Sequence, residues 1–273
     1  MTQSDAPRRD GMPTFGLGTW QNDDPDACAE SVRTALETGY RHIDTAQIYH
    51  NEAAVGRGIA AADVDREDVF LATKVWLDKL GGEEVIESTE ESLERLGTEY
   101  LDLLYVHWPS GQYDPEETLS AFERLYEAGT INRIGVSNFE PEHLETAQAA
   151  IDAPIFANQV EIHPLLQQRE LRSFCADAGI ELVAYSPLAR GDVFEVDTLS
   201  EIAETHGVSE ARVSLAWLRE KGITAIPKAT GAEHIRDNWA SLDLELTDAE
   251  IGRIDDISAE RRFVDPDFGP SSW

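Results

Sequence analysis

Positive charge is scarce in this chain of 273 residues, which holds 22 Lys and Arg against 53 Asp and Glu and has a formal net charge of −31. A surface this negative repels phosphate, so we expect neither nucleic acid nor an anionic membrane surface as a partner. Only four of the cations are lysines: Lys74, Lys79, Lys221 and Lys228. In molar salt, repulsion between surface carboxylates is screened beyond about 3 Å, so a dense acidic surface is tolerated there. This composition therefore predicts a halophilic source.

Cysteines and long apolar runs are scarce as well. Cys28 and Cys175 show neither a CxxC nor a metal-ligand spacing, so we expect no disulfide framework and no metal site. No run approaches the roughly 18 apolar residues that span a membrane, and residues 1–13 lack the apolar core of a signal peptide. The sequence therefore predicts a cytoplasmic protein without a membrane partner.

Strand-like and helix-like segments alternate along the whole chain. Several helix-like stretches open on Asp-Pro or Glu-Pro and end on glycine. Eight such strands without an intervening linker predict one α/β domain over residues 1–273, with a short polar segment at 1–12 and a short tail at 259–273. The number and length of the units favour a closed (β/α)8 TIM barrel. The expected strands are 14–20, 40–46, 69–75, 101–108, 131–138, 155–162, 180–187 and 223–227.

The main competing fold is an open, doubly wound sheet. That fold would be expected to carry a glycine-rich turn after an early strand, and the run "GLGTW" at 16–20 lacks the GxGxxG spacing.

In a barrel, chemistry belongs at the carboxyl ends of the strands. A buried Lys and Asp there must pair, and the Lys charge would lower the pKa of a nearby Tyr from about 10. Each residue alone has an ordinary explanation, such as a turn cap for Asp44 or a core position for His107, but the combination favours catalysis. The polar residues at these ends are Asp44, Lys74, His107, Ser137, Asn138, Gln159, Tyr185, Ser186 and Lys228, with Tyr49 in the loop after Asp44.

Three segments resemble the signatures of the aldo-keto reductases: "GYRHIDTAQIYHNEAAVG" at 39–56, "IGVSNF" at 134–139 and "IPKATGAEHIRDN" at 226–238. The resemblance covers nearly the whole chain and is of the short microbial type, similar to the 2,5-diketo-D-gluconate reductases. It implies a (β/α)8 barrel that reduces aldehydes and ketones with NADPH or NADH and needs no metal. That family binds its cofactor without a Rossmann fold, in agreement with the missing GxGxxG.

The resemblance also implies roles for individual residues. Tyr49 would protonate the carbonyl oxygen, Lys74 paired with Asp44 would lower the pKa of Tyr49, and His107 would orient the carbonyl. Trp20, Trp76 and Trp108 match the aromatic walls of the substrate pocket. The positions that match cofactor contacts are Thr19, Ser137, Asn138, Gln159, Tyr185, Ser186, Pro187, Leu188, Lys228, Ala229, Thr230, His234, Asp237 and Asn238.

The cofactor tail departs from the family pattern. Ala229 and His234 stand where members that prefer NADP usually have Ser and Arg. A neutral imidazole cannot replace a guanidinium fork on a 2′-phosphate, so we expect both cofactors to be used.

The two ends of the chain depart from the pattern too. The N-terminal segment leaves room for little more than one strand of the hairpin that closes the barrel bottom in many members. The short C-terminal tail predicts an open pocket, with Phe263, Phe268 and Trp273 either folding over its mouth or packing outside.

Two other functions are compatible with parts of the sequence. One is a non-catalytic, nicotinamide-binding redox-sensing subunit, which the complete tetrad disfavours. The other is a cofactor-free barrel aldolase or isomerase with Lys74 as a Schiff base, which has no use for the cofactor positions. The sequence identifies neither the physiological carbonyl substrate nor the direction of the reaction in the cell, and we expect a monomer rather than an oligomer.

Overall fold

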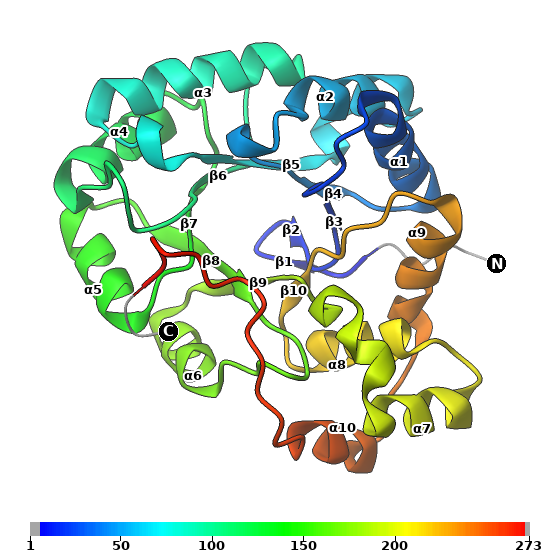
Figure 1. The fold of residues 1–273 in the computed structure, drawn as a ribbon. Coiled ribbons are helices and arrows are strands. Elements are labelled where there is room, and N and C mark those ends of the chain that lie inside the picture. The colour runs from blue at the N-terminus through cyan, green and yellow to red at the C-terminus, as the bar shows by residue number, and fades with distance from the viewer. Residues whose placement is uncertain (1–5, 271–273) are drawn as a thin grey trace.

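The computed structural model describes residues 6–270. One sheet of eight parallel strands runs in the order β10-β9-β8-β7-β6-β5-β4-β3. Parallel bridges from Phe15 to Ala225 and from Gly18 to Lys228 join its two edges, so the sheet closes into the predicted barrel (Figure 1). The strands are β3 (Leu17–Gly18), β4 (His42–Asp44), β5 (Phe70–Val75), β6 (Leu103–Val106), β7 (Ile134–Ser137), β8 (Ile155–Glu161), β9 (Glu181–Tyr185) and β10 (Thr224–Ala225).

Helices surround this barrel (Figure 1). Two start where the sequence predicts, because the Asp24 and Asp114 carboxylates accept hydrogen bonds from N–H groups of the first turn. Gly179 ends another helix with φ of +68°, a conformation that glycine adopts without strain. The helices are α1 (Pro25–Thr38), α2 (Glu52–Ala61), α3 (Gly82–Leu96), α4 (Pro115–Glu127), α5 (Pro141–Ala150), α6 (Arg169–Ala178), α7 (Asp197–His206), α8 (Glu210–Glu220), α9 (Ala232–Trp239) and α10 (Asp248–Asp255).

A complete β-hairpin lies at the amino-terminal end of the barrel, and this corrects the expectation of little more than one strand. Strands β1 (Arg8–Arg9) and β2 (Met12–Pro13) pair antiparallel. The hairpin fits into so short a segment because Asp10 and Gly11 both adopt positive φ, 46° and 85°, as a two-residue turn requires. Met12 is fully buried and belongs to the same apolar cluster as Phe70 and Leu103, so the hairpin seals this end.

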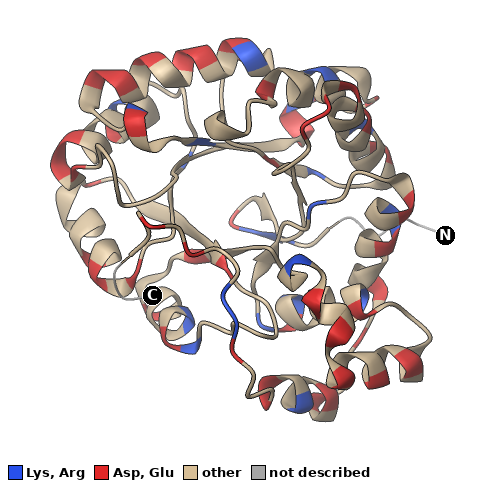
Figure 2. Ribbon diagram, in the orientation of Figure 1, with Lys and Arg blue, Asp and Glu red and all other residues tan. Residues whose placement is uncertain are grey.

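Charge is unevenly distributed over the molecule. Figure 2 shows acidic residues along the outer helices, whereas most of the barrel wall is neither acidic nor basic. Among residues 6–270, no helix combines the length and the apolar character needed to cross a membrane.

Candidate active site

A cavity of about 670 Å³ opens at the carboxyl ends of the barrel strands. It includes groups from most of the strands and from the loops that follow them, as expected for a barrel. The predicted site residues that line it are Thr19, Trp20, Asp44, Tyr49, Trp76, His107, Trp108, Ser137, Asn138, Gln159, Tyr185, Ser186, Pro187, Leu188 and Lys228.

Lys74 lies outside the cavity lining, buried in the barrel, and pairs with Asp44 as the sequence predicts. Its Nζ donates to Asp44 Oδ1 at 2.5 Å and to the Thr45 carbonyl oxygen at 2.7 Å. Gln159 Nε2 donates to the other Asp44 oxygen at 2.8 Å. These bonds supply the partners that a buried ion pair needs in order to be stable. Because Asp44 lines the cavity while Lys74 lies behind it, the charges of the pair act on the other residues of the cavity.

Tyr49 lies in the short helix η1 (Gln47–Tyr49), with its ring centroid 5.2 Å from Lys74 Nζ. Burial raises the pKa of Tyr49 well above its ordinary value, and the negative charge of Asp44 raises this pKa further. The pKa of Tyr49 is therefore raised on balance, and not lowered as the sequence predicts, because burial and the Asp44 charge act against the expected effect of Lys74. A raised pKa keeps the phenol protonated, the form that a proton donor needs.

His107 directly follows β6 and faces the same cavity. Burial lowers its pKa well below the ordinary value, and the Lys74 charge lowers this pKa further, so the imidazole is neutral. Its ring packs edge-on against Trp76 at 5.0 Å and Tyr49 at 5.9 Å. Its Nδ1 is buried and has no hydrogen-bond partner among residues 6–270. A neutral imidazole has one N–H to donate, which suits it to orient a carbonyl oxygen.

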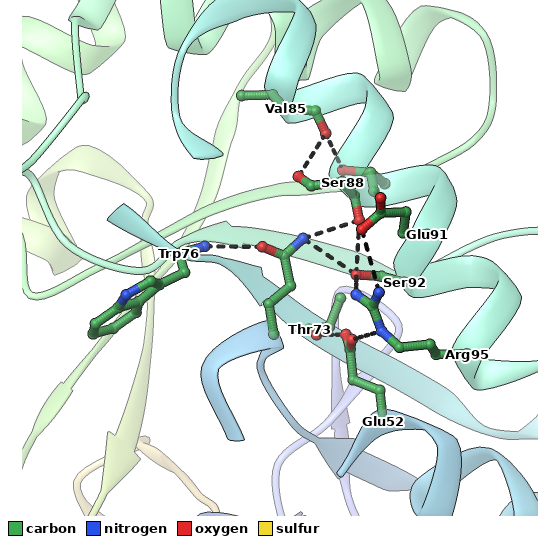
Figure 3. A network of polar contacts seen from close by, with 10 residues as sticks. Glu52, Thr73, Trp76, Val85, Ser88, Glu91, Ser92 and Arg95 are labelled. Atoms are coloured by element: carbon green, nitrogen blue, oxygen red, sulfur yellow. Dashed lines mark hydrogen bonds and ion pairs between the residues drawn. The ribbon is translucent and has the colours of Figure 1, made fainter. Parts of the chain in front are cut away.

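The turn that carries Tyr49 is fastened to the neighbouring strand and helix by Gln47, a residue that sequence reasoning missed. Gln47 Oε1 accepts a bond from the Trp76 N–H at 3.1 Å. Gln47 Nε2 donates to the Ser88 carbonyl oxygen at 3.1 Å and to Ser92 Oγ at 3.2 Å. Figure 3 shows these partners converging between β5 and α3. Gln47 thus fixes both the Tyr49 turn and the start of the Trp76 loop.

A buried carboxylate extends the same network (Figure 3). Glu52 accepts from Thr73 Oγ1 at 2.7 Å and from Arg95 Nε at 2.8 Å. Burial lowers the pKa of Lys74 on balance, and the charges of Asp44 and, to a lesser degree, Glu52 act in the opposite direction.

Amide and hydroxyl groups interlock on the opposite side of the cavity. Asn138 has a positive φ of 65°, and its Nδ2 donates to the His107 carbonyl oxygen and to Ser137 Oγ. Asn138 Oδ1 accepts from the Tyr185 hydroxyl at 2.8 Å, and Ser137 Oγ donates to the Gln159 carbonyl oxygen at 2.7 Å. These hydrogen bonds link the side chains of Ser137, Asn138 and Tyr185 to one another, so their orientations are set before any ligand binds.

Two exposed cations line the cavity wall. Lys228 follows the last strand, and Arg190 lies in helix η4 (Ala189–Glu195) with its guanidinium 4.6 Å from the Trp20 ring centroid. Sequence reasoning missed Arg190, although a cation directly after the "SPLA" stretch was a usable signal.

Comparison with known proteins identifies the family of this chain. The model of the Aldo/keto reductase family matches residues 11–259. The chain belongs to this family. A glyoxal reductase of Bacillus subtilis (strain 168) is 42% identical over 92% of this chain and 91% of its own length.

Two solved structures extend the comparison. A putative 2,5-diketo-D-gluconic acid reductase B superposes with a TM-score of 0.91 at 36% identity and covers 96% of this chain and 94% of its own. The Bombyx mori aldo-keto reductase in complex with NADP superposes with a TM-score of 0.89 at 32% identity and covers 96% of both chains. This aldo/keto reductase is accordingly an oxidoreductase that acts on carbonyl groups.

Five predicted cofactor residues of this aldo/keto reductase do not line the cavity. Asp237 accepts hydrogen bonds from Arg212 Nε at 2.7 Å and from Ser209 Oγ at 2.6 Å, so both of its oxygens serve the packing of α9 on α8. The five residues are Ala229, Thr230, His234, Asp237 and Asn238, and all lie in α9 or in the segment before it. A role for them in cofactor binding stays a prediction.

The C-terminal tail lines part of the reductase cavity, so Phe268 folds over the mouth, one of the two alternatives that the sequence allows. Val264, Pro266 and Phe268 line the cavity. Phe263 instead packs on His163, with ring centroids 5.5 Å apart. Trp273 lies outside the described residues. A short tail suffices to reach the mouth because it leaves α10 and crosses the barrel rim directly (Figure 1).

Both cysteines of the reductase are free and buried. Burial raises the pKa of Cys28 to about 11 and that of Cys175 to about 12, so both stay as unreactive thiols. In residues 6–270, no three or more His, Cys, Asp and Glu side chains form a group that could hold a metal ion.

Proposed function

We propose that this protein reduces aldehydes and ketones to alcohols with NADPH or NADH, and that Tyr49 is the proton donor. The observation that carries the proposal is the meeting of a protonated phenol, a neutral imidazole and a buried ion pair at one cavity. General acid catalysis needs a proton donor that faces the substrate in its protonated form, and Tyr49 meets both conditions.

The residues that line the cavity fit a nicotinamide cofactor. Interlocked amides and hydroxyls at Ser137, Asn138 and Gln159 match the hydrogen-bonding edge of a carboxamide. Lys228 and Arg190 supply positive charge that suits the phosphates. When bound, the nicotinamide supplies the hydride to the carbonyl carbon.

The protein's own groups then have separate tasks. The His107 N–H orients the carbonyl oxygen, and the Tyr49 hydroxyl protonates it. The Lys74 ammonium, 5.2 Å from the Tyr49 ring centroid, offsets part of the cost of the phenolate left after proton transfer.

Lys74 does not suit the competing role of a Schiff base. Burial lowers its pKa, which favours an amine nucleophile, but Nζ is outside the cavity lining and donates to Asp44 and Thr45. A substrate in the cavity has no direct approach to it. Borohydride trapping with substrate tests this role, since a covalent Lys74 adduct would reverse the assignment.

We propose that both cofactors are used. His234 is exposed at the start of α9, where it offers no guanidinium fork to a 2′-phosphate, while Lys228 retains one cation. The kcat/KM values with NADPH and NADH should lie within about a hundredfold of each other, equivalent to roughly 2.7 kcal/mol. A larger ratio would reject dual use.

The proposed substrates are small carbonyl compounds. Trp20, Trp76 and Trp108 give part of the cavity apolar walls, which supports a broad range of substrates. Because one relative is a glyoxal reductase, 2-oxoaldehydes belong in the test panel. The net charge of −31 supports activity in molar KCl, a cytoplasmic location in a halophile, and a monomer.

The deciding experiment follows cofactor absorbance with purified protein in molar KCl. Aldehydes, ketones, sugars and keto acids are each offered with NADPH and with NADH. Turnover of any of them supports the reductase. Tight cofactor binding without turnover of any carbonyl supports the redox-sensing alternative instead.

A further inference from the structure

Glu161, the last residue of β8, is a buried carboxylate that the catalytic site does not use. Its side chain is fully buried, and its Oε1 accepts bonds from His163 Nε2 at 3.0 Å and from the Phe263 N–H at 2.9 Å. Its Oε2 accepts from the Val264 N–H at 2.9 Å. Two of these three donors belong to residues 261–268, which we term the C-terminal segment.

The position of Glu161 follows from the alternation of side chains along a strand. Residues two apart point to the same face, so Glu161 shares the face of Gln159. Gln159 donates to Asp44 at 2.8 Å, and Glu161 stands one step nearer the end of the strand. Strand β8 therefore contacts the Asp44 carboxylate through Gln159 and anchors the C-terminal segment through Glu161.

The C-terminal segment forms an aromatic wall of the cavity. Phe268 packs edge-on against Trp76 at 5.9 Å and against Trp108 at 5.4 Å, both with an interplanar angle of 88°. The last residues drawn in red in Figure 1 cross the rim of the barrel beside β8. The rings of Phe268, Trp76 and Trp108 bound a space suited to a flat apolar group, and His107 packs edge-on against Trp76 beside it.

Glu161 accepts two hydrogen bonds from the backbone of this segment. Arg261 also pairs with Asp192 of η4, but the two side chains are 63% and 31% exposed, and exposed ion pairs contribute little. The Arg261 N–H donates to the Leu165 carbonyl oxygen at 2.7 Å, a single bond. Burial raises the pKa of the Glu161 carboxyl, and its three hydrogen bonds outweigh this and lower the pKa on balance, so the carboxylate is ionised.

We propose that Glu161 is a positioning residue that sets substrate selectivity. It holds the backbone at Phe263 and Val264, and this places Phe268 against the two tryptophans. The resulting wall favours carbonyl substrates that carry a planar aromatic group. This inference rests on the proposed reductase function.

The test compares an aryl aldehyde with propanal in wild type and Glu161→Ala. Displacing Phe268 removes one aromatic contact to the bound aryl ring, which corresponds to up to about a tenfold change, so the KM of the aryl aldehyde should rise about tenfold in the variant. The kcat with propanal should stay within about twofold of wild type, because the catalytic groups are untouched. An equal rise in KM for both substrates would overturn the proposal.

Further variants separate positioning from general damage. Phe268→Ala should reproduce the loss of selectivity. The double variant with Glu161→Ala should show little further loss, because both substitutions remove the same aromatic wall. Glu161→Gln keeps one accepting oxygen and should restore part of the selectivity. Glu145→Gln, an exposed position on α5, should leave it unchanged. Additive losses in the double variant would count against the proposal.

A binding measurement keeps the inference independent of turnover. Benzyl alcohol is titrated while the fluorescence of the tryptophans is followed, and this needs no reduction. If the wild type reduces no carbonyl compound, the proposed function fails while this titration still tests the wall. Equal affinity in wild type and Phe268→Ala would overturn the inference, whereas about tenfold weaker binding would support it. Phe268→Ala and Glu161→Gln carry the test if Glu161→Ala does not fold.

Discussion

The two ends of the barrel interior are built from the same strands and have opposite characters. At the amino-terminal end, Met12 of the hairpin packs with Phe70 and Leu103 in a hydrophobic cluster. At the carboxyl end, Asp44 and Lys74 pair at a cavity that Tyr49 and other polar side chains line.

The difference shows how the barrel separates stability from chemistry. Apolar packing at the sealed end needs only matched volumes, whereas the open end buries charges that are tolerated because each has partners. Changes at the open end should therefore affect activity first, and changes at the sealed end should affect stability alone.

The largest expected effect is that of Tyr49→Phe. The variant loses the proton donor and keeps the ring, so kcat/KM should fall at least about a thousandfold, or roughly 4 kcal/mol, with little change in cofactor affinity. Steady-state kinetics and cofactor titration measure the two quantities. Tyr126→Phe, at a half-exposed position on α4, is the matched control. Retention of turnover would remove Tyr49 from the mechanism.

Lys74→Met should lower both activity and stability. It leaves the Asp44 carboxylate buried with only the Gln159 amide as a side-chain partner, which costs about 3 kcal/mol of unfolding free energy. Urea unfolding in molar KCl measures this loss. Lys79→Met removes an exposed lysine and should change little. Equal effects of the two variants would contradict the assigned role of the buried pair.

Met12→Ala tests the sealed end. Truncating this fully buried side chain should reduce the free energy of unfolding by about 3 kcal/mol through lost burial and a residual cavity. The kcat should stay unchanged at temperatures where the variant is folded. A fall in kcat without a loss of stability would break the proposed separation of the two ends.

A smaller effect is expected at the outer edge of the cofactor region. His234→Arg supplies a guanidinium fork and should raise the ratio of NADPH to NADH kcat/KM about tenfold, equivalent to roughly 1.4 kcal/mol. Glu233→Gln removes a nearby negative charge without adding a fork and should shift the ratio less. If the two variants shift it equally, net charge rather than fork geometry decides the preference.

The smallest expected effect is that of pH. His107 has a pKa lowered well below 6.5 and stays neutral as pH falls to that value, and Tyr49 has a pKa raised well above 10.0 and stays protonated as pH rises to that value. The kcat/KM for a neutral carbonyl should therefore be flat between these two pH values. An alkaline limb inside this range would show that Tyr49, or Lys74 with its lowered pKa, loses its proton there.

Much of this protein could be predicted from the sequence because its signals are local. Neighbouring residues alone show the alternation of strands and helices, the Asp caps and the glycine ends. These signals predicted the eight strands within a few positions. The hairpin was missed because its strands have two residues each, too short for any alternation to show. The direction of the Tyr49 pKa was missed because it depends on how completely the fold excludes water.

The sequence by itself determined the barrel, the scarcity of lysine and the set of residues that reach the strand ends, since all three follow from pattern and composition. Only the tertiary structure decided that Glu161 holds a segment about a hundred residues away, that Arg190 lies over Trp20, and that burial raises the pKa of Tyr49. Contacts between distant residues and the loss of solvent arise when the chain closes on itself, so no local pattern contains them.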